Sequence, residues 1–230
     1  MGKERLDSYK GKLNYKQITD GINAAKRNAK RLAEDAELLL KNKRYPGAVS
    51  LAILSIEETG KEHILREMST KTDEKEIRKI WNRYRRHLDK NVLWAFPHLY
   101  IEGARKLEDF RDIFKPDAET SYTIEQVKQI SIYSDCLGNA NWSEPENLID
   151  ENLAISIVEI AKLFIKSKKM EYKEIELWIK HMQPVEGKSH TEKKIALLRW
   201  FKEMHDLGLR PKGEKLADVM RFLGIKFKNE

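Results

Sequence analysis

Hydrophobic and polar positions alternate with the period of an α-helix along most of the chain. Between residues 15 and 42, apolar side chains recur at steps of three and four, and many positions on the opposite face carry lysine or arginine. This spacing places the apolar side chains on one side of an amphipathic helix. No segment shows the strict alternation that is typical of a half-buried β-strand. The pattern therefore predicts an all-α fold.

Proline, glycine and polar turns divide the pattern into further helices. Pro46 suits the first turn of a second helix, and Pro97 marks the end of a third. The predicted helices cover residues 15–42, 46–68, 74–96, 122–138 and 150–168. We expect them to form one antiparallel bundle over residues 15–170, preceded by an N-terminal extension at 1–14. Glycine and proline break residues 171–230 into short amphipathic pieces, which predicts a small C-terminal helical module.

The second predicted helix carries charge into a segment that is otherwise apolar. Residues 55–63 read SIEETGKEH and follow directly on the apolar run AVSLAIL. Leu54 lies four positions before Glu58 and Leu65 lies seven after it, so we expect Glu58 in the middle of a buried face. A carboxylate among leucines needs positively charged partners or a raised pKa. We therefore expect Glu58 to pair with Lys61 and with cations of a neighbouring helix.

The third predicted helix supplies such cations in NRYRRHLDKN, residues 82–91. One interpretation is a buried salt-bridge network that fixes the register of the two helices. A second is a polar cleft that binds or cuts a phosphate-bearing ligand. A third is a metal site formed by Glu58 and Glu62 with His63 or His87, but the sequence lacks the pair of Glu-x-x-His motifs found in carboxylate metal sites of helical bundles. We therefore predict no metal and no cofactor.

Composition narrows the functional classes. The chain has a net charge of +7, which permits binding to nucleic acid without requiring it. Cys136 is its one cysteine, so no disulfide can form within the chain, and a reducing cytoplasm is the expected location. No apolar run approaches the roughly 20 residues of a membrane span, and we expect no membrane partner. The sequence motifs of phosphate-binding loops and zinc proteases do not occur.

The loop NANWSEPEN, between the fourth and fifth predicted helices, contains Trp142. An aromatic side chain in such a loop either closes the end of the bundle or anchors a partner. We expect Trp142 to close the bundle.

Three segments, in this order along the chain, carry a family resemblance. They are SLAILSIEETGKEHIL at 50–65, RYRRHLDKN at 83–91 and VKQISIYSDCLGNANWSEP at 127–145. Together they resemble the AbiV-type abortive infection proteins of the HEPN superfamily. The resemblance implies an HEPN-like bundle of four or five helices, a role in prokaryotic defence against phage, and often a dimer. Many HEPN proteins are metal-independent endoribonucleases that use an Arg-x4–6-His motif near the start of a late helix.

The sequence departs from this motif in the fourth predicted helix, which has Lys128, Tyr133 and Asp135 where the pair is expected. Lysine holds a phosphate as a point charge without the bidentate fork of arginine, and tyrosine is a poor base at neutral pH. Arg199 and His205 have the required spacing. They lie outside the resembling segments, however, and we expect them to belong to an amphipathic packing helix.

The candidate site therefore draws on three predicted helices. Its candidate catalytic residues are His87 as the acid/base, Arg83 and Arg86 for the phosphate, and Glu58 and Lys61 as orienting groups. Its candidate substrate-binding residues are Lys90, Lys128, Tyr133 and Asp135.

The functional hypothesis is an abortive-infection effector, acting as a metal-independent endoribonuclease or as a toxin of the translation apparatus. The expected partners are a second copy of the chain, RNA or a ribosome-associated target, and a phage protein. The alternative is a non-catalytic HEPN bundle that binds a protein or nucleotide partner and uses its polar network for structure only. A solvent-accessible cleft lined by Arg86, His87 and Lys128 would favour the enzyme. A dry, fully paired network would favour the alternative.

Overall fold

The fold is known from a computed structural model, which describes residues 8–114, 119–211 and 213–225. It is all-α, as predicted, apart from one small β-ribbon. The α-helices are α1 (Tyr15–Lys41), α2 (Tyr45–Ser69), α3 (Glu74–Arg85), α4 (Phe96–Ile101), α5 (Glu119–Ile132), α6 (Pro145–Leu148), α7 (Glu151–Phe164), α8 (Tyr172–Met182), α9 (His190–Asp206) and α10 (Leu216–Phe222). The 3-10 helices are η1 (Leu88–Ala95), η2 (Leu107–Phe114) and η3 (Gln183–Val185), and the strands are β1 (Cys136–Leu137) and β2 (Asn141–Trp142).

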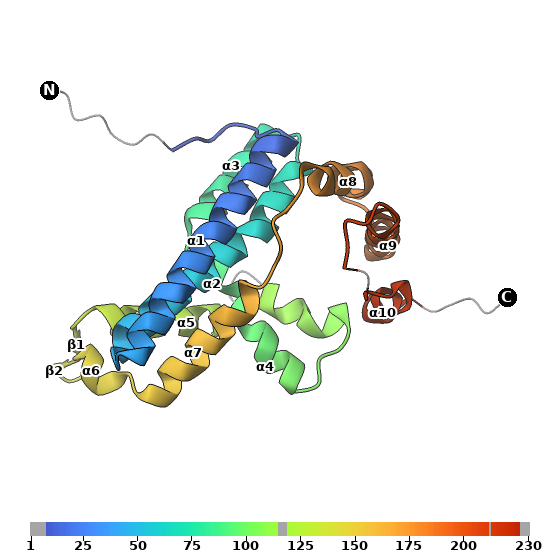
Figure 1. The fold of residues 1–230 in the computed structure, drawn as a ribbon. Coiled ribbons are helices and arrows are strands. Elements are labelled where there is room, and N and C mark those ends of the chain that lie inside the picture. Colours follow the sequence, from blue (N-terminus) through green and yellow to red (C-terminus); the bar gives the residue numbers. More distant parts are fainter. Residues whose placement is uncertain (1–7, 115–118, 212, 226–230) are drawn as a thin grey trace, which may run out of the picture.

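The long helices α1 and α2 form the hairpin that organises the fold (Figure 1). Asn14 caps α1, because its side chain accepts a hydrogen bond from the Gln17 backbone and the Gln17 side chain accepts one from the Asn14 backbone. Lys43 takes a left-handed conformation, with φ of 57°, in the turn between the two helices. Pro46 lies in the first turn of α2, as the sequence predicts.

The hydrophobic core has two main parts along this hairpin. Near the turn, apolar side chains of α1 and α2 pack against α5 and α7. Toward the other end, they pack against α3 and α8. Helix α2 contacts α1, α3, η1, α5, α7 and α8. It is therefore the central element of the bundle, which explains why its sequence is apolar on more than one side.

The third predicted helix is wrong in its second half. Helix α3 ends at Arg85, and Arg86 takes an extended conformation with φ of −80° and ψ of 133°. The chain then continues as η1, which packs against both α2 and α5. Gly60 permits this packing, because a Cβ atom there would lie only 2.1 Å from the backbone oxygen of Lys90. The close contact between η1 and α2 is a tertiary effect that the helical period does not reveal.

The fourth predicted helix is too long, because α5 ends at Ile132. The following residues form an antiparallel ribbon in which Cys136 pairs with Trp142. Gly138 and Ala140 turn the ribbon with positive φ angles. Trp142 is 75% exposed, so the expectation that it closes the end of the bundle is wrong.

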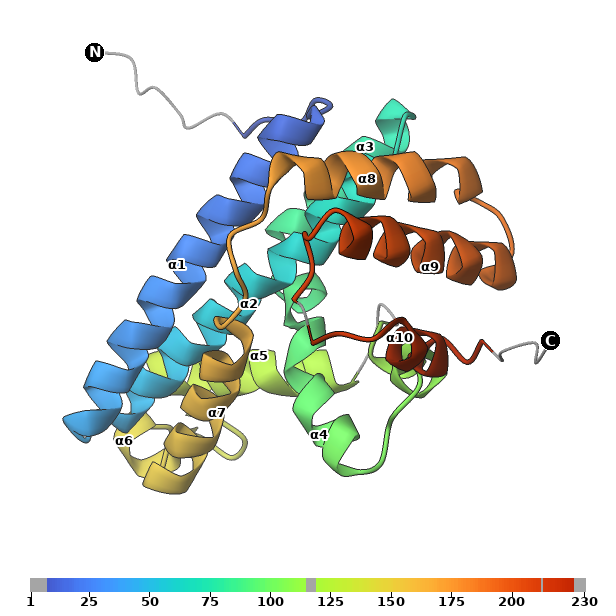
Figure 2. The ribbon, with the colours of Figure 1, turned by 45° about the vertical axis from the view of Figure 1, so that its right-hand side comes forward.

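Helices α8, α9 and α10 follow the bundle on one side of the hairpin (Figure 2). They have a small apolar cluster of their own, formed by Leu177, Trp200, Phe201, Met204 and Leu209. Ile175 of α8 instead belongs to the bundle core, so α8 joins the two regions. The chain before α1 also packs on the bundle, since the Trp81 indole nitrogen donates to the backbone oxygen of Gly11 at 2.9 Å. Across the described ranges, no helix is both long enough and apolar enough to cross a membrane.

The contact between Gly60 and η1 predicts a stability effect. We expect Gly60→Ala to lower the free energy of unfolding by about 1–3 kcal/mol, the usual cost of overpacking, because the Lys90 backbone oxygen cannot rotate away. Urea denaturation measures this change. Gly213→Ala is the control, because its Cβ atom would meet nothing within 4 Å. Equal stability of the two variants would contradict the role given to Gly60.

Candidate functional site

Glu57 is a buried carboxylate at the centre of a group of cations. Its side chain is 3% exposed. The Lys128 ammonium donates to Glu57 Oε1 at 2.6 Å, and His87 Nδ1 lies 2.6 Å from Oε2. The Lys90 ammonium is 3.8 Å from the same Oε2 atom. Two lysines and one histidine therefore surround this one acid, Lys90 from η1, His87 from the turn before η1 and Lys128 from α5.

The local fold explains how these groups meet. Glu57 lies four residues after Ile53 and three before Gly60, on one side of α2. Gly60 admits the backbone of η1 at that side of the helix, which brings Lys90 and the preceding His87 next to Glu57. Helix α5 packs on both α2 and η1 and brings Lys128.

A second carboxylate balances the charges. Lys128 Nζ donates to Glu125 Oε2 at 2.7 Å as well as to Glu57, so one ammonium is shared between two acids. Burial favours a higher pKa for Glu125, but its hydrogen bonds from Lys128 and Gln129 outweigh burial and hold that pKa below its ordinary value. For Lys90, burial lowers the pKa despite the opposing effect of Glu57.

His87 is the part of this group that reaches solvent. Its side chain is 53% exposed, whereas that of Lys128 is 4% exposed. With Glu57 ionised, the imidazole donates its Nδ1 proton to the carboxylate, and this fixes the ring orientation and the tautomer. Nε2 has no hydrogen-bond partner within the described ranges. It is therefore available to accept a proton from, or donate one to, a molecule at the surface.

Three of these residues, Glu57, His87 and Glu125, are of types that bind metal ions. Ligand atoms of Glu57, His87 and Glu125 all lie within 4.8 Å of one another. However, the Lys128 ammonium is hydrogen bonded to both of these carboxylates. A divalent ion bound there would have to displace a buried ammonium, so these residues do not fit a metal site as they are arranged.

The structure brings together three of the residues selected from the sequence, which are His87, Lys90 and Lys128. The expectation that Glu58 is the embedded acid is wrong. Glu58 is only partly buried and pairs with Lys61 at 2.5 Å. The reason is that the face of α2 around Leu54 is half-buried, whereas the face of Ile53 and Glu57 is fully buried.

The remaining candidates lie outside the Glu57 group. Arg83 donates to both carboxylate oxygens of Glu67 at 2.8 Å. Arg86 follows α3 with its side chain 61% exposed, and its Nε atom is 3.4 Å from Asp89. Tyr133 is exposed after the end of α5. Asp135 accepts a hydrogen bond from the backbone of Cys136 at the start of the ribbon.

Glu57 and Glu125 are the site residues that the sequence reasoning missed. A signal existed for Glu57, since it continues the spacing of Val49, Ile53 and Ile64 on the most apolar face of α2. For Glu125, the signal was its position three residues before Lys128 on one helix.

Comparison with known proteins identifies the class. The HEPN_AbiV family model, described as AbiV, matches residues 17–166, which run from the first turn of α1 to just past the end of α7. The bundle is thus a HEPN-type fold, and the chain belongs to the AbiV family of HEPN proteins. Searches of curated proteins and of solved structures found no match to the chain.

The burial of Glu57 predicts a clear difference between two adjacent glutamates. We expect Glu57→Gln to reduce the free energy of unfolding by about 3–5 kcal/mol, because it removes the negative charge next to the buried Lys90 ammonium and one of the two carboxylates that hold Lys128. Glu58→Gln, which removes a partly exposed pair, is expected to cost no more than about 1 kcal/mol. Chemical denaturation of both variants measures the difference. A similar loss in both would mean that Glu57 does not have the role described.

Proposed function

We propose that this AbiV-family protein is an abortive-infection effector that cleaves RNA without a metal, with His87 as the acid/base. The observation that carries the proposal is the 2.6 Å contact between Glu57 Oε2 and His87 Nδ1, on an imidazole that is half exposed. A carboxylate that orients a histidine from inside the protein, with the other ring nitrogen at the surface, is an arrangement suited to proton transfer.

The reaction uses the 2′-hydroxyl of RNA as the nucleophile. His87 Nε2 takes the 2′-hydroxyl proton while the O2′–phosphorus bond forms. The bond from phosphorus to the 5′-oxygen then breaks, and that oxygen takes up a proton from the imidazolium or from water. The products are a 2′,3′-cyclic phosphate and a free 5′-hydroxyl. No electron transfer or additional reactant is involved.

The charges around His87 support this role. The Glu57 carboxylate stabilises the imidazolium that forms during proton transfer. Lys90 and Lys128 face Glu57 from buried positions, so we assign them to balancing its charge instead of the substrate contact expected from the sequence. Arg86, next to His87 and largely exposed, is the proposed phosphate contact.

The proposed partners are a second copy of the chain, an RNA or ribosome-associated target and a phage protein, and the proposed location is the cytoplasm. Tyr133 and Asp135 lie just after α5 and would contribute to a site completed by a second copy of the chain. An RNA or ribosome-associated target and a phage protein as trigger fit an abortive-infection effector. The cytoplasm fits such a target, and it would keep the exposed thiol of Cys136 reduced.

One observation favours the alternative, a non-catalytic bundle that binds a protein or nucleotide partner. Glu57 and Lys128 form an ion pair that is almost fully buried. A second observation weighs against a purely structural network. Asn91 of η1 is fully buried, and neither polar atom of its side chain has a partner within the described ranges. A buried unsatisfied amide is unusual where polar groups serve stability alone.

The proposal predicts that cleavage depends on His87. We expect His87→Ala to reduce the rate of RNA cleavage by about 10²–10⁴-fold, the usual contribution of a general acid or base. Added imidazole should restore part of the activity. The measurement follows a labelled RNA with purified protein, with and without a chelator. His205→Ala is the control, because His205 is also half exposed and lies on α9, away from the Glu57 group.

Two results would contradict the assignment. Equal cleavage by wild type and His87→Ala would remove His87 from the mechanism. No cleavage of cellular RNA by wild type, together with equal toxicity of both forms on expression in bacteria, would favour the non-catalytic alternative.

A further inference from the structure

One side of α3 presents a row of polar and basic side chains to solvent. Lys75, Lys79 and Asn82 are exposed and follow one another at steps of four and three, so they share one side of the helix. Arg78 is also exposed and lies beside them. We call these four residues the α3 face.

The positive charge of the α3 face is only partly compensated. The acids of α3 are Glu74 and Glu76, both in its first turn, where negative charge suits the start of a helix. Arg78 pairs with Glu74 at 3.5 Å. Lys75 and Lys79 have no hydrogen-bond or ion-pair partner within the described ranges. These two ammonium groups are therefore available to an external anion.

Cations on α1 are arranged differently. Lys30, Arg31 and Lys41 each pair with an acid four residues away on the same helix. Such pairing is typical of a helix face that meets only solvent. The α3 face lacks it beyond the first turn, which favours a negatively charged partner there.

The chain before α1 adds further cations beside the α3 face. A hollow of about 650 Å³ lies between this segment and α3. Three cations line it, Lys10, Lys12 and Arg78, against one acid, Glu74, which is the partner of Arg78. The hollow is therefore a place where the phosphates of a strand bound to the α3 face could also meet positive charge.

Tyr9 gives this surface an aromatic side chain. Its ring is 57% exposed and packs edge-on against Trp81, with 6.1 Å between the ring centroids. Its hydroxyl donates to the backbone oxygen of Lys12 at 3.0 Å, and Arg85 donates to the backbone oxygen of Tyr9 at 2.6 Å. An exposed ring held among cations suits the stacking of a nucleic-acid base. Bases inside a duplex are already stacked, so the ring favours a single strand.

The α3 face leads to the candidate site. Helix α3 ends at Arg85, and His87 follows two residues later, so their Cα atoms lie within about 7 Å of each other. From Lys75 to Arg85 the helix is about 15 Å long. A stacked strand advances 3.4 Å per nucleotide, so this length corresponds to roughly four nucleotides. A strand bound along α3 would therefore reach His87.

We propose that the α3 face, together with Tyr9 and the lysines before α1, binds the single-stranded RNA that His87 cleaves, a role that rests on the proposed function of His87. Phosphates contact Lys75 and Lys79, and a base stacks on Tyr9. The exposed Arg86 then receives the phosphate next to the imidazole.

Fluorescence anisotropy of a labelled ten-nucleotide oligouridylate tests the proposal, with the full chain titrated at several salt concentrations. The His87→Ala variant keeps the strand intact and should bind it as wild type does. In that variant, Lys75→Ala and Lys79→Ala should each raise the Kd about three- to tenfold. Each should also reduce the slope of log Kd against log salt by about 0.7, the value for one lost phosphate contact to a single strand. Tyr9→Ala should raise the Kd by about fivefold or more, whereas Tyr9→Phe should keep the stacking.

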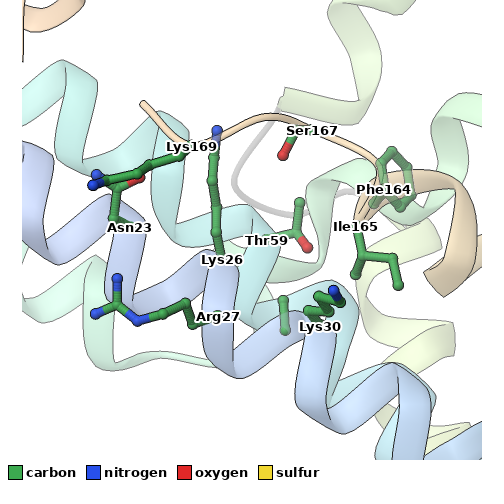
Figure 3. A pocket seen from close by; sticks show the side chains of 10 residues that line it. Asn23, Lys26, Arg27, Lys30, Thr59, Phe164, Ile165, Ser167 and Lys169 are labelled. Atoms are coloured by element: carbon green, nitrogen blue, oxygen red, sulfur yellow. The ribbon is translucent and has the colours of Figure 1, made fainter. Parts of the chain in front are cut away.

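Lys30→Ala is the matched control. It removes the same charge from a second group of cations, which lines a hollow between α1, α2 and the linker from α7 to α8 (Figure 3). An equal effect of Lys30→Ala and Lys79→Ala would overturn the proposal, because binding would then follow net charge. No binding of the strand at about 50 mM salt would also overturn it. So would equally tight binding of the same strand paired with oligoadenylate, or of polyglutamate.

Cleavage measured on the same variants separates this surface from the reaction. Binding that depends on Lys75 and Lys79, without any cleavage by wild type, would contradict the role of His87 and support the surface. Cleavage that depends on His87, with binding unchanged in both lysine variants, would support the reaction and contradict the surface.

Discussion

The negative charge of Glu57 is the constraint on which the middle of the bundle depends. A carboxylate that is removed from water must be neutralised by nearby cations, and these come from η1 and α5. The ion pairs of Glu57 with Lys90 and Lys128 therefore hold η1 and α5 against α2. Gly60 acts at the same place, since it lets the η1 backbone approach while Glu57 supplies the attraction. His87 is thus oriented by the same contacts that hold the fold together.

The sharing of Lys128 between two carboxylates has a consequence for the chemistry. The Lys128 ammonium lies inside the protein and is hydrogen bonded to Glu57 and Glu125. It therefore neutralises these two acids and is not in a position to bind a phosphate. At the surface next to His87, Arg86 is the exposed cation of this segment, and it is paired with Asp89 at 3.4 Å. A homodimer, as proposed, would compensate for this, because a second copy could bring further cations to the same phosphate.

The sequence predicted the long elements well, because their stability depends on a period that can be read directly. The predicted bounds of α1 and α2 agree with the observed ones to within a few residues, and the sequence pattern also identifies Lys90 and Lys128, which lie close to Glu57 in the structure. The break at Arg86 was missed, because it depends on the approach of η1 to Gly60. The sequence predicts Glu58 as the buried acid, whereas the buried acid is Glu57. The two are hard to tell apart because both lie beside apolar positions of a helix that is surrounded by neighbours. Only the positions of those neighbours decide which carboxylate is buried.

The linker between α7 and α8 ties the family-matched bundle to the helices that follow it. Asn23 and Lys26 hold the linker on α1, and the Lys168 side chain donates to the backbone oxygen of Leu209, between α9 and α10. Ile175 of α8 packs in the core of the bundle. The C-terminal region is therefore held by two kinds of contact, apolar packing through α8 and hydrogen bonds through the linker.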